Sequence, residues 1–153
     1  YRIIWKGERM LMKKYKVGYT QGVYDMFHAG HLNLINNAKQ YCEYLIVGVN
    51  SDNLVQEYKH KTPVIRQEER RFIVENIKAV DEALIAETLD KVVAYNQLHF
   101  DAIFIGDDWK GDPRWEATQE EMNKYGVDVV FLPYTEGISS TLLRIELDRV
   151  IKD

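Results

Sequence analysis

The chain has 153 residues, of which 46% are hydrophobic, and carries a formal net charge of −4. This length and composition suit one domain with a real core, and the acidic balance argues against a nucleic-acid-binding protein. The single cysteine, Cys42, excludes an internal disulfide, and no apolar run approaches the roughly 20 residues of a membrane helix.

From residue 1 to residue 14 the chain mixes apolar and charged residues and lacks the unbroken apolar centre of a signal peptide. We interpret residues 1–14 as an N-terminal extension or a remnant of recombinant expression. Residues 15–153 show no linker, repeat or low-complexity segment. The sequence therefore predicts one soluble, cytoplasmic domain.

Short apolar segments alternate with longer helical patterns along the rest of the chain. The predicted strands are residues 16–20, 44–50, 79–85, 101–105 and 127–132, and the predicted helices are residues 32–41, 67–77, 88–98, 114–125 and 141–151. Thr88 and Ser139 or Ser140 suit helix caps. This alternation predicts an α/β, Rossmann-like, doubly wound sheet of about five parallel strands. Such sheets bind ligands outside the carboxyl ends of their strands.

The first predicted strand runs into the segment Gly22-Val-Tyr-Asp-Met-Phe-His28-Ala-Gly-His31. Histidines three apart at a helix start place both rings on one side of the first turn, where the helix N-terminus favours phosphate. Gly30 lets a triphosphate approach the backbone, and Asp25 could cap the turn or help to hold a metal ion. The alternatives are a metal pair or two surface histidines, but no third ligand has zinc-like spacing.

Two further segments also lie where a ligand would bind. Lys59-His-Lys61 falls in a stretch without strong periodicity, where flexible lysines could fold over a triphosphate or simply be solvated. Gly106-Asp-Asp-Trp109 follows the fourth strand, and an aspartate there could take a ribose hydroxyl or a metal ion, or form an ordinary turn.

The aromatic residues near these segments permit another interpretation. If several of them shared one pocket, they could hold a quaternary ammonium group, although core or rim positions are commoner. They are Tyr24, Tyr58, Trp109, Trp115 and Tyr134.

The segment Thr135-Glu-Gly-Ile-Ser-Ser-Thr141 leads into the last predicted helix. Its hydroxyl and N–H groups could form a second anion site at a helix N-terminus, or only a capped helix. Arg144 follows one turn into that helix.

Together these segments, in this order, resemble the cytidylyltransferase family, the nucleotidyltransferases with the His-x-Gly-His motif. The resemblance runs from about Lys16 to Arg144. It is stronger to the bacterial glycerol-3-phosphate cytidylyltransferases than to the choline- and ethanolamine-phosphate enzymes. It implies transfer of CMP from CTP to a small phosphorylated alcohol, first of all glycerol 3-phosphate for cell-wall or capsule precursors. It also implies direct displacement of pyrophosphate with Mg²⁺, and a homodimer.

The resemblance also assigns roles to residues. The catalytic set is His28, His31, Lys61 and Arg70, and the acceptor-binding set is Lys59, Lys61, Arg70, Lys78 and Trp109. The nucleotide-binding set is Gly22, Val23, Tyr24, Asp25, Gly30, His31, Lys59, Asp107, Tyr134, Thr135, Gly137, Ile138, Ser139, Ser140, Thr141 and Arg144.

Two positions depart from the family pattern. Val23 stands where the family usually has threonine, and Tyr134 stands where it usually has the arginine that helps to recognise cytosine. Tyrosine cannot supply the planar charged donors of arginine. Use of ATP, another phosphorylated acceptor such as phosphocholine, and a nucleotide-binding module without catalysis therefore stay open. The first turn lacks the Gly-x-Gly-x-x-Gly of an oxidoreductase, and no Gly-Lys-Ser/Thr of a P-loop kinase occurs.

Overall fold

The structure, a computed structural model, describes residues 3–6, 9–133 and 140–152. Five parallel strands form its main sheet: β3 (Tyr15–Gly22), β4 (Cys42–Asn50), β5 (Glu82–Ala86), β6 (Ala102–Gly106) and β7 (Asp128–Leu132). Their order across the sheet is β5-β4-β3-β6-β7. The predicted α/β, Rossmann-like sheet is confirmed.

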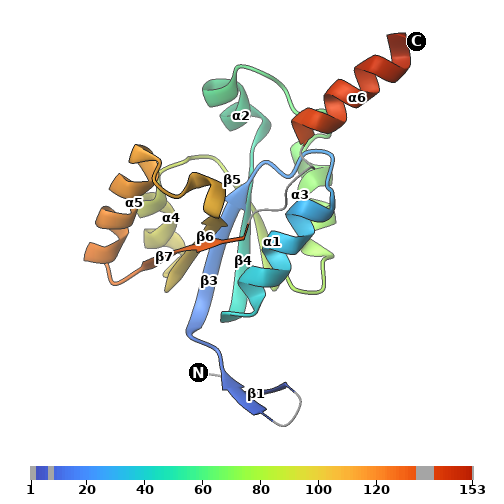
Figure 1. Cartoon of the computed structure of the whole chain (residues 1–153). Coiled ribbons are helices and arrows are strands. Elements are labelled where there is room, and N and C mark those ends of the chain that lie inside the picture. Colours follow the sequence, from blue (N-terminus) through green and yellow to red (C-terminus); the bar gives the residue numbers. More distant parts are fainter. Residues whose placement is uncertain (1–2, 7–8, 134–139, 153) are drawn as a thin grey trace.

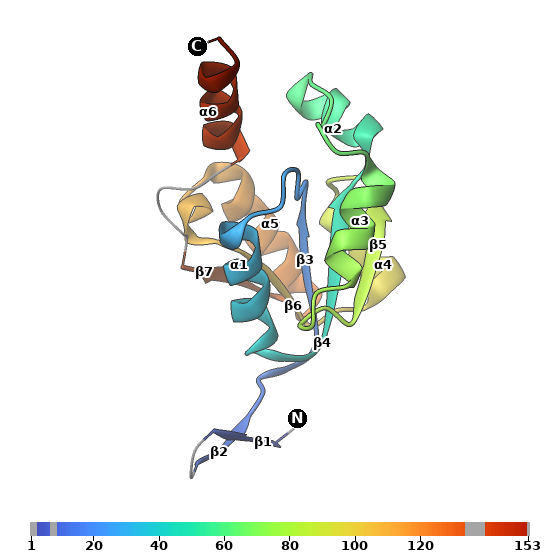
Figure 2. The ribbon, with the colours of Figure 1, turned by 90° about the vertical axis from the view of Figure 1, so that its right-hand side faces the viewer.

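Helices cover both faces of this sheet (Figure 1). They are α1 (Ala29–Lys39), α2 (Asp52–Lys59), α3 (Gln67–Glu75), α4 (Lys91–Leu98), α5 (Pro113–Lys124) and α6 (Ser140–Lys152). Figure 2 shows α1 and α3 on the face nearer the viewer, with α4 and α5 on the other side. No helix of the described ranges is long and apolar enough to cross a membrane.

Two apolar cores follow from this layering. The core under α1 and α3 includes Ile35, Leu45 and Val74, all fully buried. The core under α4 and α5 includes Phe100 and Met122. The central strands are apolar along nearly their whole length because both of their faces are covered.

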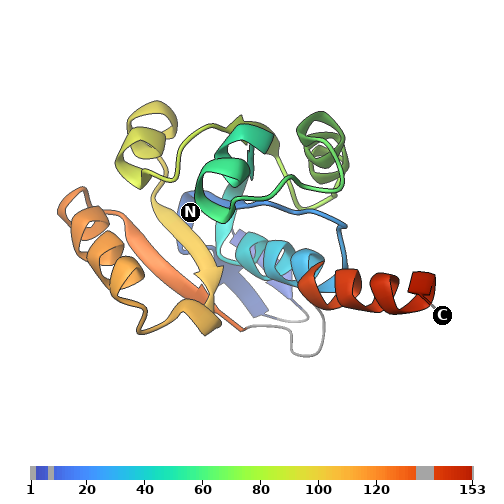
Figure 3. The same cartoon turned by 90° about the horizontal axis from the view of Figure 1, so that it is seen from above.

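The strand order reverses between β3 and β6, since the chain first builds the sheet toward β5 and then returns to build it toward β7. Such a reversal opens a crevice at the carboxyl ends of the two strands. Helices α2 and α6 lie at this edge of the molecule, and Figure 3, seen from that side, shows α6 projecting away past α1. The fold therefore places the expected ligand-binding edge at the ends of β3 and β6.

Some elements differ from the sequence-based predictions. Within residues 1–14, β1 (Ile3–Lys6) and β2 (Arg9–Met12) form a separate antiparallel pair. Helix α2 was not predicted; it is eight residues long, and of these Leu54 and Val55 are buried. Helix α4 is capped by Asp90 rather than by Thr88, whose hydroxyl accepts from the Asp90 N–H.

Candidate active site

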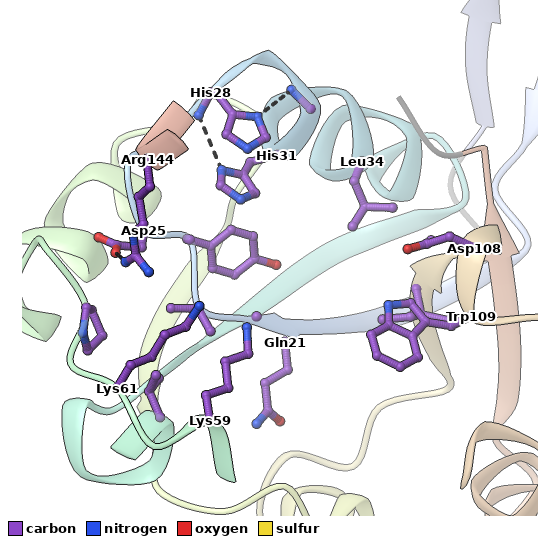
Figure 4. Close-up of a pocket in the computed structure, with 18 of the residues that line it drawn as sticks. Gln21, Asp25, His28, His31, Leu34, Lys59, Lys61, Asp108, Trp109 and Arg144 are labelled. Atoms are coloured by element: carbon purple, nitrogen blue, oxygen red, sulfur yellow. Dashed lines mark hydrogen bonds and ion pairs between the residues drawn. The ribbon is translucent and has the colours of Figure 1, made fainter. Parts of the chain in front are cut away.

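A pocket of about 300 Å³ opens where the strand order reverses. Its walls come from the end of β3, the first turns of α1 and α6, the segment after α2 and the end of β6. Figure 4 shows Lys59 and Lys61 pointing from the α2 side toward the α1 histidines, with Trp109 and Asp108 on the far side. The lining residues are Gln21, Gly22, Val23, Tyr24, Asp25, His28, Gly30, His31, Leu34, Val55, Lys59, Lys61, Pro63, Ile105, Gly106, Asp108, Trp109, Pro133 and Arg144.

The two histidines form a reciprocal cap at the start of α1. The Nδ1 atom of His28 accepts from the Gly30 N–H at 3.0 Å, and the Nδ1 atom of His31 accepts from the His28 N–H at 3.3 Å. The two rings stack with their centroids 3.8 Å apart. A neutral imidazole whose Nδ1 accepts must carry its proton on Nε2. Both rings therefore present Nε2–H donors, and the predicted placement on one side of the first turn is confirmed.

The environment keeps these rings neutral. Burial lowers the pKa of His28, and burial together with the neighbouring His28 lowers the pKa of His31 to about 4. The Nε2 atom of His28 is itself buried and has no hydrogen-bond partner among the described residues. A buried donor without a partner is costly, so this atom is suited to meet an acceptor that a ligand brings.

Asp25 ties the pocket walls together. Its side chain is 3% exposed and accepts from the N–H groups of Val64 at 2.8 Å and Ile65 at 2.9 Å. Arg144, from α6, forms an ion pair with the same carboxylate. Burial acts to raise the pKa of Asp25, but these hydrogen bonds and the Arg144 cation together lower it. Asp25 thus holds the segment after α2 and the start of α6 against the turn that leads to α1.

The backbone of this turn is unusual. Tyr24 has a φ of 56° and Met26 a φ of 48°, which places both neighbours of Asp25 in the left-handed region. Such conformations cost energy in residues other than glycine and persist where the surroundings enforce them. The hydrogen bonds of Asp25 supply that enforcement and direct the chain from the end of β3 into α1.

The lysine pair lies opposite the histidines. Lys59 is the last residue of α2 rather than part of a loop, and His60 then turns the chain with a φ of 58°. Burial, with Lys61 and Arg144 as further causes, lowers the pKa of Lys59. The pocket therefore gathers three cations, Lys59, Lys61 and Arg144, around one opening.

Arg70 does not line this pocket, although it was predicted to bind the acceptor and take part in catalysis. It is 1% exposed, and its guanidinium donates to the carbonyls of Ile65, Val23 and Asn50 at 2.7–2.8 Å. It also pairs with Asp52 at 2.6 Å. The structure gives Arg70 the role of joining the segment after α2 to the ends of β3 and β4.

Asp107 and Asp108 follow β6, and only the second of them faces the pocket. Asp108 lines it, whereas Asp107, which was predicted to bind the nucleotide, does not. Burial, with the neighbouring Asp107 as a further cause, raises the pKa of Asp108. The one-turn 3₁₀ helix of residues 107–109 determines which side chain points inward, and spacing alone could not show this. Trp109 lines the pocket as predicted.

Lys78 lies at the edge of the sheet where the strands begin, and the pocket lies at the edge where they end. It is exposed in the turn that leads from α3 into β5, and a residue that precedes a strand lies at the amino edge of a parallel sheet. The prediction that it binds the acceptor is therefore wrong for this structure.

Several predicted nucleotide-binding residues cannot be placed. Tyr134, Thr135, Gly137, Ile138 and Ser139 lie outside the described residues, and so do the side chains of Ser140 and Thr141. Arg144, which follows these residues in α6, is described, and its Nε atom is buried without a hydrogen-bond partner among the described residues.

The described residues contain no group of three side chains suited to hold a metal ion. Asp25, suggested as a metal ligand, uses its carboxylate on backbone N–H groups and Arg144 instead. A Mg²⁺ ion held mainly by the side chains of this pocket does not fit that arrangement.

Sequence reasoning missed part of the lining. Gln21, Leu34, Val55, Ile105 and Pro133 all line the pocket without belonging to any motif. Gln21 and Ile105 could have been found, since each precedes the glycine that ends a strand at the ligand-binding edge. The others depend on the packing of helices and loops.

Comparison with known proteins identifies the family of this chain. The cytidylyltransferase-like family model matches residues 19–146. A glycerol-3-phosphate cytidylyltransferase of Bacillus spizizenii is 35% identical over 129 residues, covering 84% of this chain and 94% of the relative. The enzyme of the same name from Staphylococcus aureus is 32% identical, covering 84% of this chain and 92% of the relative.

Among solved structures, the lipopolysaccharide core biosynthesis protein of Thermoplasma volcanium has a TM-score of 0.67 and 25% sequence identity. It covers 79% of this chain and 97% of its own. The solved structure and the family model thus agree on a nucleotidyltransferase-type fold.

Proposed function

This chain belongs to the cytidylyltransferase-like family and is a nucleotidyltransferase, and from that premise we propose that it transfers CMP from CTP to glycerol 3-phosphate, forming CDP-glycerol and releasing pyrophosphate. One observation carries the proposal. The neutral histidines direct two Nε2–H donors from the N-terminus of α1 toward a pocket whose opposite wall carries Lys59 and Lys61.

The proposed reaction is a direct displacement. A phosphate oxygen of the acceptor attacks the α-phosphorus of CTP, forming a new P–O bond as the bond to the bridging oxygen of pyrophosphate breaks. Such transfers depend on positioning and charge neutralisation more than on a protein nucleophile. His28 and His31 would donate to the oxygens on which charge accumulates, and fixed donors of this kind contribute strongly in a closed site.

The two lysines and Arg144 would hold the phosphates. Lys59 and Lys61 come from the α2 side, so they can bring the acceptor phosphate toward the α-phosphorus. Two phosphorylated substrates repel each other, and cations between them reduce that repulsion. Arg70 and Asp25 would act indirectly, by fixing the segment that carries Lys61.

Mg²⁺ remains a proposal for this protein. Because the described pocket side chains do not form a metal cage, we expect the ion to arrive coordinated by triphosphate oxygens and water. The step assigned to His28, His31 and the lysines above does not depend on a protein ligand to the ion.

The preference for CTP is supported by the named relatives rather than by a base contact. Val23 lines the pocket without a hydroxyl, and its carbonyl accepts from Arg70 at 2.7 Å, so its backbone is fixed whatever its side chain.

The test is a panel of pyrophosphate release. CTP, ATP, GTP and UTP are each combined with glycerol 3-phosphate, phosphocholine and ribitol 5-phosphate in the presence of Mg²⁺. We expect the fastest release with CTP and glycerol 3-phosphate. Fastest release with ATP would replace the nucleotide in this proposal, and no release with any pair would leave a binding module.

A further inference from the structure

Four polar side chains form a chain of hydrogen bonds that runs from the interior of the sheet to the end of α2. Tyr19 is 1% exposed, and its hydroxyl donates to the Oε1 atom of Gln21 at 2.8 Å. The Nε2 atom of Gln21 donates to the Oδ1 atom of Asn50 at 2.7 Å, and the Nδ2 atom of Asn50 donates to the Tyr58 hydroxyl at 3.0 Å. Tyr58 belongs to the last turn of α2, so these hydrogen bonds join β3 and β4 to that turn.

The buried end of this chain of hydrogen bonds fixes the orientation of the Asn50 amide. Gln21 also donates to the Thr88 carbonyl at 2.9 Å, so its amide nitrogen and oxygen are both engaged. Because the oxygen of Asn50 accepts from Gln21, its nitrogen must point the other way, toward α2. A Cβ atom at Gly48 would collide with the Tyr19 hydroxyl, so this glycine leaves the space that the first hydrogen bond needs. Asn50 therefore presents a fixed donor to α2.

The last turn of α2 packs little of its surface against the rest of the protein. The buried residues of this helix, Leu54 and Val55, belong to its first half, and residues 56–62 are exposed. A turn with few buried apolar contacts opens easily, because little free energy opposes the opening. The hydrogen bond from Asn50 to Tyr58 thus fastens an otherwise exposed turn to the sheet.

Lys59 lies on the ring that this hydrogen bond holds. Its ammonium is 5.6 Å from the centroid of the Tyr58 ring, within the range of a cation–π interaction. A ring held by its hydroxyl restricts the positions that the ammonium can take. Lys59 lines the pocket across from the α1 histidines, whereas Tyr58 does not line that pocket (Figure 4). The contact therefore extends from the buried donor of Asn50 to a cation of the candidate site.

We propose that Tyr58 is a positioning residue: held through its hydroxyl by Asn50, it keeps Lys59 where the lysine meets a substrate phosphate. This inference rests on the proposed function. Tyr58 also lines the hollow that adjoins the pocket, so a direct contact with a substrate is the alternative explanation for a kinetic effect. The two explanations differ in one respect, since only the first requires Lys59.

Tyr58→Phe removes the hydroxyl and keeps the ring. At saturating CTP we expect the KM for glycerol 3-phosphate to rise about three- to tenfold, the scale of one hydrogen bond, while kcat changes less and the Tm stays within about 2 °C. Tyr44→Phe is the matched control. Tyr44 is 41% exposed, against 36% for Tyr58, and its hydroxyl donates to Glu82 at 3.1 Å near the amino edge of the sheet. Its loss should leave both kinetic constants as in the wild type.

The same substitution in a Lys59→Gln background separates positioning from direct contact. Without the ammonium there is nothing for the Tyr58 hydroxyl to position, so adding Tyr58→Phe should change the KM by less than about 1.5-fold. An equal rise of the KM in both backgrounds would overturn the inference and indicate that the hydroxyl contacts the substrate itself.

Hydrogen exchange tests the fastening of the turn without any substrate. The His60 N–H donates to the Gln56 carbonyl at 3.0 Å in the last turn of α2. We expect exchange at the His60 amide to be at least about threefold faster in Tyr58→Phe than in the wild-type protein, and unchanged in Tyr44→Phe. Unchanged exchange in Tyr58→Phe would overturn the inference. If no acceptor gives turnover, the proposed function fails by itself and the exchange rates decide the inference.

Discussion

The two ring nitrogens of His28 have different environments. The Nδ1 atom of His28 caps α1 by accepting from Gly30, and the Nε2 atom of the same ring is buried without a partner among the described residues. The cap fixes the ring and its tautomer, so the donor is oriented before any substrate binds. Such preorganisation is what makes a donor effective in a transition state.

The cap and the donor of His28 can be separated by substitution. His28→Asn places an oxygen near the position of Nδ1 and retains the cap, but it removes the Nε2–H donor. We expect kcat to fall about 10²–10³-fold while the Tm stays within about 3 °C. The measurements are pyrophosphate release and thermal unfolding.

His28→Gln is the reciprocal control, because its amide nitrogen reaches toward the position of Nε2 and the cap is lost. It should retain more activity than His28→Asn and lose more Tm. The opposite order for the two variants would show that the ring acts through the fold rather than through its donor.

His31 makes stability depend on pH. Its pKa in the folded protein is about 4, against about 6.5 in an unfolded chain. Between these values the unfolded chain binds a proton that the folded protein does not, so the free energy of unfolding falls as the pH drops from 6.5 to 4. We expect His31 to account for a loss on the order of 1–2 kcal/mol after allowance for its partial exposure.

Urea denaturation at several pH values across this window measures that loss. His31→Asn keeps an acceptor for the His28 N–H but does not titrate, so its stability should depend less on pH. Equal slopes for the wild-type protein and His31→Asn would contradict the assignment.

At the scale of elements, the site depends on a segment without regular structure, residues 61–66, that Asp25 and Arg70 fasten to the sheet. Asp25 accepts from the N–H groups of this segment, and Arg70 donates to its Ile65 carbonyl. Lys61 lies at the start of the segment. The position of Lys61, for which we propose phosphate binding, thus depends on two buried charged residues, Asp25 and Arg70.

Asp25→Asn tests this dependence. An amide cannot accept from both N–H groups and also pair with Arg144, so a buried donor is left unsatisfied. We expect a loss of about 2–4 kcal/mol of stability, faster hydrogen exchange at Val64 and Ile65, and a several-fold higher KM for the acceptor.

Glu75→Gln removes an exposed ion pair with Arg71 and serves as the control, with an expected change below about 1 kcal/mol. Unchanged exchange at Val64 and Ile65 in Asp25→Asn would show that the carboxylate does not hold the segment.

The central strands could be predicted from their apolar runs, whereas helix α2 could not. The runs that became β4 and β6 are buried on both faces, so composition alone identified them as central strands. Helix α2 buries two side chains and gives no such signal. The role of Lys59 as its last residue was missed for the same reason.

At the scale of the whole molecule, the position of the site followed from topology. The alternation of strands and helices predicted a parallel sheet with its ligand at the carboxyl edge, and the pocket lies there, between β3 and β6. The same rule places Lys78 at the amino edge of the sheet, away from the pocket. The family resemblance suggested that Lys78 binds the acceptor, and the strand topology argues against it. The sequence could not show whether Asp107 or Asp108 lines the pocket, because this depends on the conformation of the 3₁₀ turn that contains both.

Helix α6 joins the site at its start and exposes apolar side chains farther along. Arg144 near its start reaches Asp25, but farther along Ile145, Leu147 and Val150 are exposed. The homodimer implied by the family resemblance stays a prediction, and gel filtration with light scattering measures it directly.

We propose that CMP passes directly from CTP to the acceptor, and CTP labelled with ³²P at the α-phosphate tests this. With glycerol 3-phosphate present, we predict that the label appears in CDP-glycerol and that the wild-type protein itself remains unlabelled. Without an acceptor, we predict no exchange of free pyrophosphate into CTP. Labelled protein, or pyrophosphate exchange without an acceptor, would contradict direct transfer by this site.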